Sequence, residues 1–98
     1  MKYITFTIPC YNSENYMRRC VDSLLVGGED VEILIIDDGS SDRTGAIADE
    51  YEMLYPNIVQ AVHKPNGGHG SGVNKGLELA HGLYYKVVDF FFLKRYEA

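Results

Sequence analysis

Apolar residues at every second position open the chain. From Tyr3 to Ile8, isoleucine and phenylalanine alternate with tyrosine and threonine, which is the spacing of a β-strand that ends at Pro9. Apolar residues at helical spacing follow, with Asn12 or Ser13 as the predicted N-cap and the pair Gly27-Gly28 as the end of the helix. The apolar face of this helix comprises Tyr16, Met17, Cys20, Val21, Leu24 and Leu25.

A second strand and a second helix follow. Val31 to Ile36 is apolar at nearly every position, as expected of a strand buried on both faces of a parallel sheet. Ser41 is the predicted N-cap of the next helix, which ends where Tyr55 precedes Pro56. The residues of this helix that are predicted to point inward are Ile47, Tyr51 and Leu54.

The remaining elements continue the alternation. We predict a third strand from Ile58 to His63, a glycine-rich stretch over residues 66–72, a third helix, and a fourth strand from Tyr84 to Val88. Strands that alternate with helices are joined by right-handed crossovers. The sequence therefore predicts an α/β fold, an open, mostly parallel, Rossmann-like sheet with helices on both faces. The third helix carries Val73, Leu77 and Ala80 on one side, and Gly82 ends it.

Length and composition indicate one small domain. The chain has 98 residues, of which 46% are hydrophobic, enough for a modest core. We assign residues 1–89 to this domain and residues 90–98 to an atypical C-terminal tail. Cys10 and Cys20 lack a metal-type spacing and are predicted to be free, buried thiols.

The charge and the apolar pattern narrow the possible partners. A net charge of −5 argues against nucleic acid as a partner, because phosphate backbones are bound by basic faces. No apolar run reaches the roughly 20 residues of a transmembrane segment, and the first residues do not form a signal peptide. We therefore expect a cytoplasmic protein.

Polar residues and glycines gather where the predicted strands end. These segments are residues 9–12, 37–42 and 64–70, together with Asp89, whereas the loops at the other ends, 27–30 and 80–83, are plainer. In an open parallel sheet, ligands bind outside the carboxyl ends of the strands. The sequence therefore predicts one functional edge.

Two acidic residues end the second strand. Asp37 and Asp38 repel each other unless donors, a cation or solvent stabilise them, and they could either cap the turn or form a ligand site. Asp89 at the end of another strand favours a site, since the carboxylates then converge. The glycine-rich stretch 66–72 matches neither the P-loop nor the dinucleotide pattern. It could be a flexible turn, or it could approach a diphosphate whose charge Lys64 offsets.

Three blocks of the sequence together resemble family 2 glycosyltransferases of the GT-A type. They are IPCYNSE at residues 8–14, VEILIIDDGSSD at 31–42, and the segment from NGG at 66–68 through GLELAHG at 76–82. Their order and spacing extend the resemblance to Asp89. It implies inverting transfer of a sugar from a nucleotide diphosphate donor, expected to be UDP-linked, to an acceptor hydroxyl.

The resemblance implies roles for the matching residues. Tyr11 would lie against a uracil-like base in a pocket shaped by Pro9, and Asp38 would accept a hydrogen bond from the base N–H. Asp37 would order the turn. The implied nucleotide-sugar site comprises Pro9, Tyr11, Asn12, Glu14, Asp37, Asp38, Gly39, Lys64, Gly67, Gly68 and Asp89.

The sequence departs from the family pattern after Asp89. This residue matches the first carboxylate of an Asp-x-Asp motif, but Phe91 stands where the metal-binding carboxylate is expected. Mn²⁺ or Mg²⁺, the cofactor of the complete enzyme, needs oxygen ligands, which a phenyl ring does not supply. We therefore expect no bound cofactor beyond an indirect metal contribution from Asp89. The family's general base has no match here, so we expect no catalytic residue and no transfer by this chain.

The tail and the overall function leave alternatives. We expect the chain to form a homo-oligomer through Phe90 to Leu93, with a disordered tail as the alternative. The alternative function is a catalytically inactive nucleotide-binding or oligomerising module. A receiver-type signalling domain is disfavoured because its acidic pair ends the first strand. No motif selects a particular donor sugar or acceptor.

Overall fold

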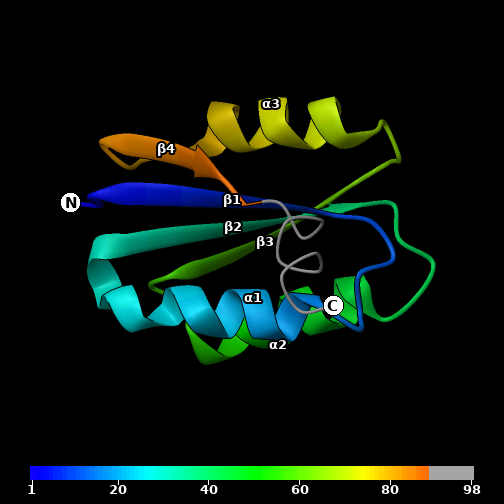
Figure 1. Ribbon diagram of the computed structural model, residues 1–98, viewed down its shortest axis with the longest axis horizontal. Coiled ribbons are helices and arrows are strands. Elements are labelled where there is room, and N and C mark those ends of the chain that lie inside the picture. The colour runs from blue at the N-terminus through cyan, green and yellow to red at the C-terminus, as the bar shows by residue number, and fades with distance from the viewer. Residues whose placement is uncertain (89–98) are drawn as a thin grey trace, which may run out of the picture.

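Four parallel strands form one open sheet in the order β3-β2-β1-β4 (Figure 1). The architecture comes from a computed structural model, which describes residues 1–88. The predictions for Asp89 and for the tail after it lie outside the described residues. The strands are β1 Ile4–Cys10, β2 Val31–Asp38, β3 Val59–Lys64 and β4 Tyr84–Val87.

The helices lie on both faces of this sheet. In Figure 1, α3 covers one face, while α1 and α2 cover the other. This arrangement confirms the α/β fold predicted from the alternation of elements. None of the helices within residues 1–88 has the length and apolar character needed to cross a membrane. The helical elements are α1 Met17–Leu24, the 3-10 segment η1 Leu25–Asp30, α2 Thr44–Leu54 and α3 His69–Leu79.

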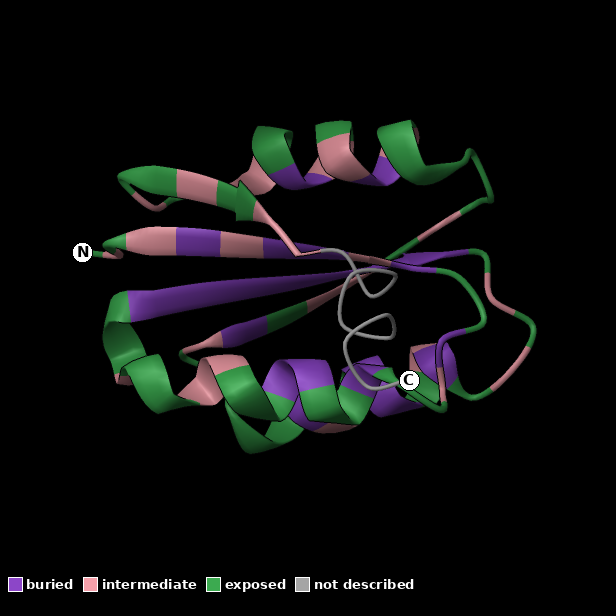
Figure 2. Ribbon diagram, in the orientation of Figure 1, coloured by how far each residue is buried: buried purple, intermediate pink, exposed green. Residues whose placement is uncertain are grey.

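The core is centred on β2. All eight residues of this strand are buried (Figure 2), as predicted from its nearly continuous apolar run. Burial of one large aliphatic side chain contributes about 1.5–3 kcal/mol, so β2 anchors both helical layers. Met17, Cys20 and Val21 of α1 are buried in the core that β2 shares with Ile8 of β1. Both cysteines are free and buried, as predicted.

The first strand is longer than predicted. It continues through Pro9, which pairs with Ile36 of β2, to Cys10. Pairing of β1 with β4 reaches only Thr7, so on that side the missing N–H of Pro9 interrupts no ladder hydrogen bond. The prediction that Pro9 ends the strand was therefore wrong.

The predicted N-caps were also wrong. Neither α1 nor α2 has a side-chain hydrogen bond from its N-cap residue, Tyr16 or Arg43. The hydroxyl of Ser13 instead bonds the backbone of Tyr11, and the hydroxyl of Ser41 donates to Asn12. A local turn contact thus engages the Ser13 hydroxyl, and a tertiary contact engages that of Ser41.

Three residues predicted to face the core are exposed: Tyr16, Leu54 and Leu77. The correction is clearest for α3, whose buried residues are Gly72 and Gly76. A Cβ at Gly76 would clash with the side chain of Thr7 in β1. The helix therefore packs through its backbone, and Leu77 is turned outward with 59% of its surface exposed.

The amino-terminal edge of the sheet holds a buried carboxylate that the sequence did not reveal. Glu32 accepts hydrogen bonds from the Thr5 hydroxyl at 2.8 Å and the His81 backbone N–H at 2.8 Å. Its second oxygen lies 2.8 Å from Nδ1 of His81. Burial alone would raise the pKa of Glu32, but these partners lower it overall. The contacts tie the loop before β4 to β1 and β2.

Candidate functional site

A pocket of about 190 Å³ lies beyond the carboxyl ends of β1 and β2. It is the edge where the sequence predicts a ligand site, because all strands run parallel and end on the same side (Figure 1). Tyr11 leaves 55% of its surface exposed, whereas Asp38 is buried. The lining residues are Pro9, Cys10, Tyr11, Asp38, Asn66, Gly68 and His69.

Asp38 is held by three donors. Lys64 Nζ lies 2.6 Å from its Oδ1, the Gly67 N–H donates to the same oxygen at 2.9 Å, and the Gly68 N–H donates to Oδ2 at 2.9 Å. Burial alone would raise the pKa of Asp38, which is 5% exposed, but the three donors lower it. The side chain is therefore an anion at neutral pH. Since Oδ2 receives one of these three hydrogen bonds, it can accept another from a ligand.

The sheet register explains this arrangement. Asp38 pairs with Lys64 in the parallel ladder between β2 and β3, which places their side chains next to each other. The chain then turns at Gly68, whose positive φ of 89° favours glycine. Lys64, which we expected to offset a diphosphate, is bound by Asp38 and by the Pro65 carbonyl at 2.7 Å.

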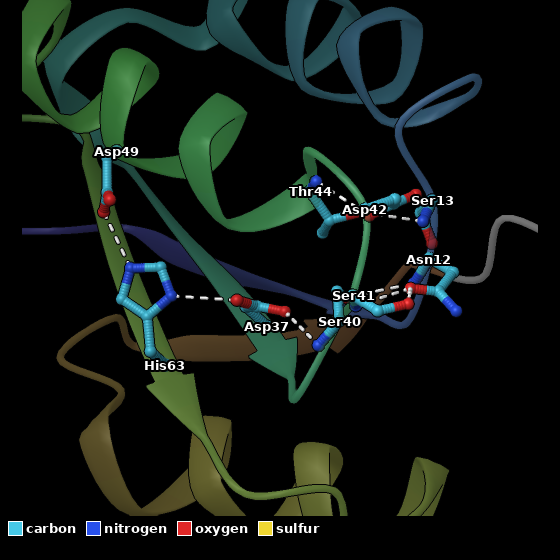
Figure 3. Close-up of polar contacts among 9 residues, drawn as sticks. All are labelled: Asn12, Ser13, Asp37, Ser40, Ser41, Asp42, Thr44, Asp49 and His63. Atoms are coloured by element: carbon cyan, nitrogen blue, oxygen red, sulfur yellow. Dashed lines mark hydrogen bonds and ion pairs between the residues drawn. The ribbon is translucent and has the colours of Figure 1, made fainter.

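The loop that carries Tyr11 is fixed by the turn after β2. The Asn12 N–H donates to Ser40 Oγ at 3.0 Å, and Asn12 Oδ1 accepts from the Ser41 N–H at 2.9 Å (Figure 3). Asn12 itself has a positive φ of 49°, which asparagine tolerates better than most residues. Its amide therefore supports the loop, and Asn12 does not line the pocket.

A second set of contacts joins the same loop to the start of α2. The Ser13 N–H donates to Thr44 Oγ1 at 2.8 Å, and the Glu14 N–H donates to Asp42 Oδ2 at 3.2 Å. Asp42 also accepts from the Thr44 N–H at 2.8 Å. Burial would raise the pKa of Asp42, but these donors lower it. Glu14 thus contributes its backbone here, and it is not among the residues that line the pocket.

Asp37 faces away from the pocket and orders the turn. Its Oδ1 accepts from the Ser40 N–H at 3.0 Å, and its Oδ2 lies 2.9 Å from Nδ1 of His63 (Figure 3). The other ring nitrogen of His63 lies 2.7 Å from Asp49 of α2. Asp37 and Asp38 therefore point to different partners, and the donors on each side offset the repulsion expected of a carboxylate pair.

Of the predicted glycines, Gly39 is required by its backbone conformation and by a close approach, whereas Gly67 is bordered by side chains. Gly39 has a φ of 70°, and a Cβ there would lie 2.8 Å from the backbone nitrogen of Asn66. At Gly67 a Cβ would lie 2.7 Å from Ser71 Oγ. A side chain at Gly39 would displace the backbone that borders the pocket, whereas one at Gly67 would push aside the side-chain ends of Ser71 and Lys64.

Four functional candidates were not singled out from the sequence. Cys10, Asn66 and His69 line the pocket, and His63 contacts Asp37. The only signal for His63 was its place at the end of the predicted third strand, because its pairing with Asp37 depends on the register between β3 and β2. The signal for the others was their position in loops that leave the carboxyl ends of strands.

The described residues offer no evident metal centre. Within residues 1–88, no three His, Cys, Asp or Glu side chains are grouped so that they could hold a metal ion. Asp89, to which the sequence assigns an indirect metal role, lies outside this range.

The chain belongs to the family described as Glycosyl transferase family 2, which matches residues 5–89. One curated relative is EpsJ of Bacillus subtilis (strain 168), an uncharacterized glycosyltransferase. It is 38% identical over 87 residues, which are 88% of this chain and 25% of EpsJ. The chain thus spans about a quarter of the length of this relative.

Solved structures of glycosyltransferases share the fold. S. aureus TarS 1–349 in complex with UDP has a TM-score of 0.78 and 26% identity, over 99% of this chain and 31% of that one. The structure of TarS 1–349 in complex with UDP-GlcNAc has a TM-score of 0.76 and 28% identity, over 99% of this chain and 30% of that one. The mannosyltransferase PcManGT from Pyrobaculum calidifontis, in complex with GDP-Man and Mn²⁺, has a TM-score of 0.79 and 20% identity, over 89% of this chain and 27% of that one. These likenesses show a GT-A glycosyltransferase fold.

Proposed function

We propose that this chain is the nucleotide-recognition part of a glycosyltransferase that uses a UDP-linked sugar donor. The observation that carries the proposal is the pocket in which an exposed aromatic ring, Tyr11, and a buried carboxylate, Asp38, lie together at the carboxyl ends of β1 and β2. Family membership and the UDP and UDP-GlcNAc complexes of TarS support it.

The two residues divide the recognition of a pyrimidine base. Tyr11 offers a flat apolar surface on which a base ring packs. Asp38, which its three donors keep anionic, accepts the N–H that uracil presents between its two carbonyl groups. The pocket volume of about 190 Å³ is below the roughly 300 Å³ at which sites for whole drug-sized ligands begin. It therefore accommodates the base, while the diphosphate and the sugar extend outward.

The reaction of the complete enzyme is the second part of the proposal. We infer that the sugar is transferred to an acceptor hydroxyl with inversion. A carboxylate would activate this hydroxyl as the general base, and this chain has no residue that matches it. A bound Mn²⁺ or Mg²⁺ would supply charge stabilisation to the departing diphosphate. We propose that Asp89 lies near this metal-bound diphosphate. The side chain of Phe91 offers the metal ion no oxygen ligand. We therefore expect this chain alone to bind nucleotide without catalysing transfer.

The alternative of a nucleotide-binding or oligomerising module without catalysis rests on Phe91. Both alternatives use the same pocket, and they differ in whether the protein transfers a sugar. Sugar transfer by this chain, or by any longer protein that contains it, would exclude the alternative. Association through Phe90 to Leu93 and a cytoplasmic location stay predictions.

Calorimetric titration with two closely related nucleotides tests the proposed pocket. UDP and CDP differ in the base edge, because cytosine presents a ring nitrogen lone pair where uracil presents the N–H. We expect UDP to bind in the millimolar to high micromolar range, about −4 to −6 kcal/mol, and CDP to bind more weakly. Replacement of Asp38 by asparagine should reduce the difference between them. Equal binding of both nucleotides by the unaltered chain would contradict the role of Asp38.

A further inference from the structure

His63 lies between two carboxylates that come from different elements. The ring of this β3 residue has Nδ1 2.9 Å from Asp37 Oδ2 on β2 and Nε2 2.7 Å from Asp49 Oδ1 on α2 (Figure 3). The imidazole side chain is 46% exposed, and Asp37 is almost fully buried. His63 is therefore within reach of solvent protons while it contacts a buried acceptor.

The two contacts together define the protonation state. Ionised carboxylates only accept hydrogen bonds, and a neutral imidazole has a single N–H to donate. Both contacts of His63 are hydrogen bonds only when the ring is an imidazolium. The hydrogen bonds with Asp37 and Asp49 accordingly raise the pKa of His63 above its ordinary value, against the opposing effect of burial.

The other charged groups near β3 are engaged elsewhere. On α2, Glu52 accepts the backbone N–H of Ala61, and Glu50 pairs with Arg18. Lys64, the residue after His63, is paired with Asp38. Asp37 and Asp49 are thus the carboxylates that His63 contacts, and the proton it carries serves these two.

A continuous set of contacts leads from His63 to the pocket. Asp37, which His63 holds through Oδ2, accepts the Ser40 N–H through Oδ1 at 3.0 Å. Ser40 Oγ accepts the Asn12 N–H at 3.0 Å. The residue before Asn12 is Tyr11, which lines the pocket. When His63 is neutral, one of its two hydrogen bonds is lost, so either Asp37 Oδ2 or Asp49 on α2 loses its hydrogen bond with the ring.

We propose that His63 is a positioning residue for nucleotide binding and that its imidazolium form holds the Asp37 turn and the Tyr11 loop in the binding arrangement. The inference rests on the proposed function, because it concerns the same pocket. Binding is strongest at low pH, where His63 is protonated, and weakens as the pH rises through the folded-state pKa of this residue. The imidazolium also stabilises the fold at low pH, and this contribution is lost over the same rise.

The test measures the affinity for uridine, which has no phosphate to titrate, from about pH 5.5 to about pH 8.5, a range that includes the ordinary histidine pKa. The ring signals of His63 are followed by NMR in the same samples. We expect the affinity to fall roughly three- to tenfold, the range for one lost hydrogen bond, with the midpoint at which His63 titrates. The Ser40 and Asn12 amide signals should follow that midpoint.

Four variants separate positioning from mere structural support. His63→Gln should bind weakly at every pH, and His63→Arg, which keeps a charge and several donors, should bind with little pH dependence. Asp49→Asn removes one carboxylate far from the pocket and should move the midpoint to lower pH. His81→Gln alters a matched histidine–carboxylate contact at the opposite edge and should leave the profile unchanged. Because His69 lines the pocket, the shift with Asp49→Asn distinguishes His63 from it.

Several results would overturn the inference. One is a folded His63→Gln protein with the unaltered pH profile, and another is an affinity midpoint that Asp49→Asn does not move. A His63 ring that titrates below its ordinary pKa would do the same. If the unaltered chain binds uridine at no pH, the proposed function fails as well, whereas binding without the His63 dependence removes the inference alone.

Discussion

Lys64 and Asp38 pair in the ladder of β3 and β2, with Nζ 2.6 Å from Oδ1. Both side chains are largely buried, so the carboxylate depends on this cation and on two backbone N–H donors to remain charged. Removal of one partner of a buried pair leaves an uncompensated charge. The pair therefore links the stability of the sheet edge to the chemistry of the pocket.

Replacement of Lys64 by methionine should destabilise the protein by about 3 kcal/mol at neutral pH, because Asp38 then stays buried without its cation. The pKa of Asp38 should rise. Urea unfolding at several pH values measures the loss, and the double variant Lys64→Met/Asp38→Asn should recover part of it. A single variant as stable as the original protein would show that the pair contributes nothing.

Two alanine substitutions in α3 should have opposite effects. Gly76→Ala places a methyl group against Thr7 and Tyr85 and should destabilise by about 1–3 kcal/mol through overpacking. Gly70→Ala, in the same helix with no neighbouring atom within 4 Å, should stabilise by about 0.5–1 kcal/mol. Denaturant midpoints of the two variants provide the comparison. Equal effects would mean that α3 does not pack through Gly76.

Removal of the charge at Glu32 should reduce stability at neutral pH. Its pKa is lowered from 4.5 in the folded protein, so its contribution is present above that value and is lost as the pH falls through the folded pKa. Glu32→Gln should cost about 2 kcal/mol near pH 7 and much less near pH 3. A cost that is the same at both values, measured by urea unfolding, would contradict this assignment.

Tyr11 should contribute to binding far more than to stability, since over half of its surface is exposed. Tyr11→Ala should weaken UDP binding about tenfold, whereas Tyr11→Phe, which keeps the ring, should change it less than about twofold. Calorimetric titration gives the affinities, and thermal unfolding is the control. If both variants lose affinity equally, the hydroxyl matters and the packing argument is wrong.

The fold could be predicted because its strongest signals are local. The apolar run of β2 indicated a doubly buried strand, and the strand–helix alternation fixed the parallel sheet. The caps could not be predicted, since the Ser13 hydroxyl bonds Tyr11 within its own turn and the Ser41 hydroxyl bonds Asn12, which is distant in sequence. The buried face of α3 was missed because Gly76 packs through its backbone, and hydrophobic periodicity does not register a glycine.

The candidate site likewise has residues that the sequence predicted and a contact that it did not. Tyr11 and Asp38 could be placed at the sheet edge from the motifs that surround them, and the structure places both on the pocket wall. The contact of His63 with Asp37 depends on the register between β2 and β3. A register is set by pairing across residues far apart in sequence, so the sequence alone did not reveal it.

The central claim is that a uridine nucleotide binds between Tyr11 and Asp38, and an NMR titration of the chain with UDP tests it most directly. Parallel titrations with GDP and dTDP compare the bases. We predict that millimolar UDP shifts the amide signals of Tyr11, Asp38 and Gly39 and leaves His81, at the opposite edge of the sheet, unmoved. Unchanged signals at these three residues, or shifts confined to the opposite edge, would contradict the account.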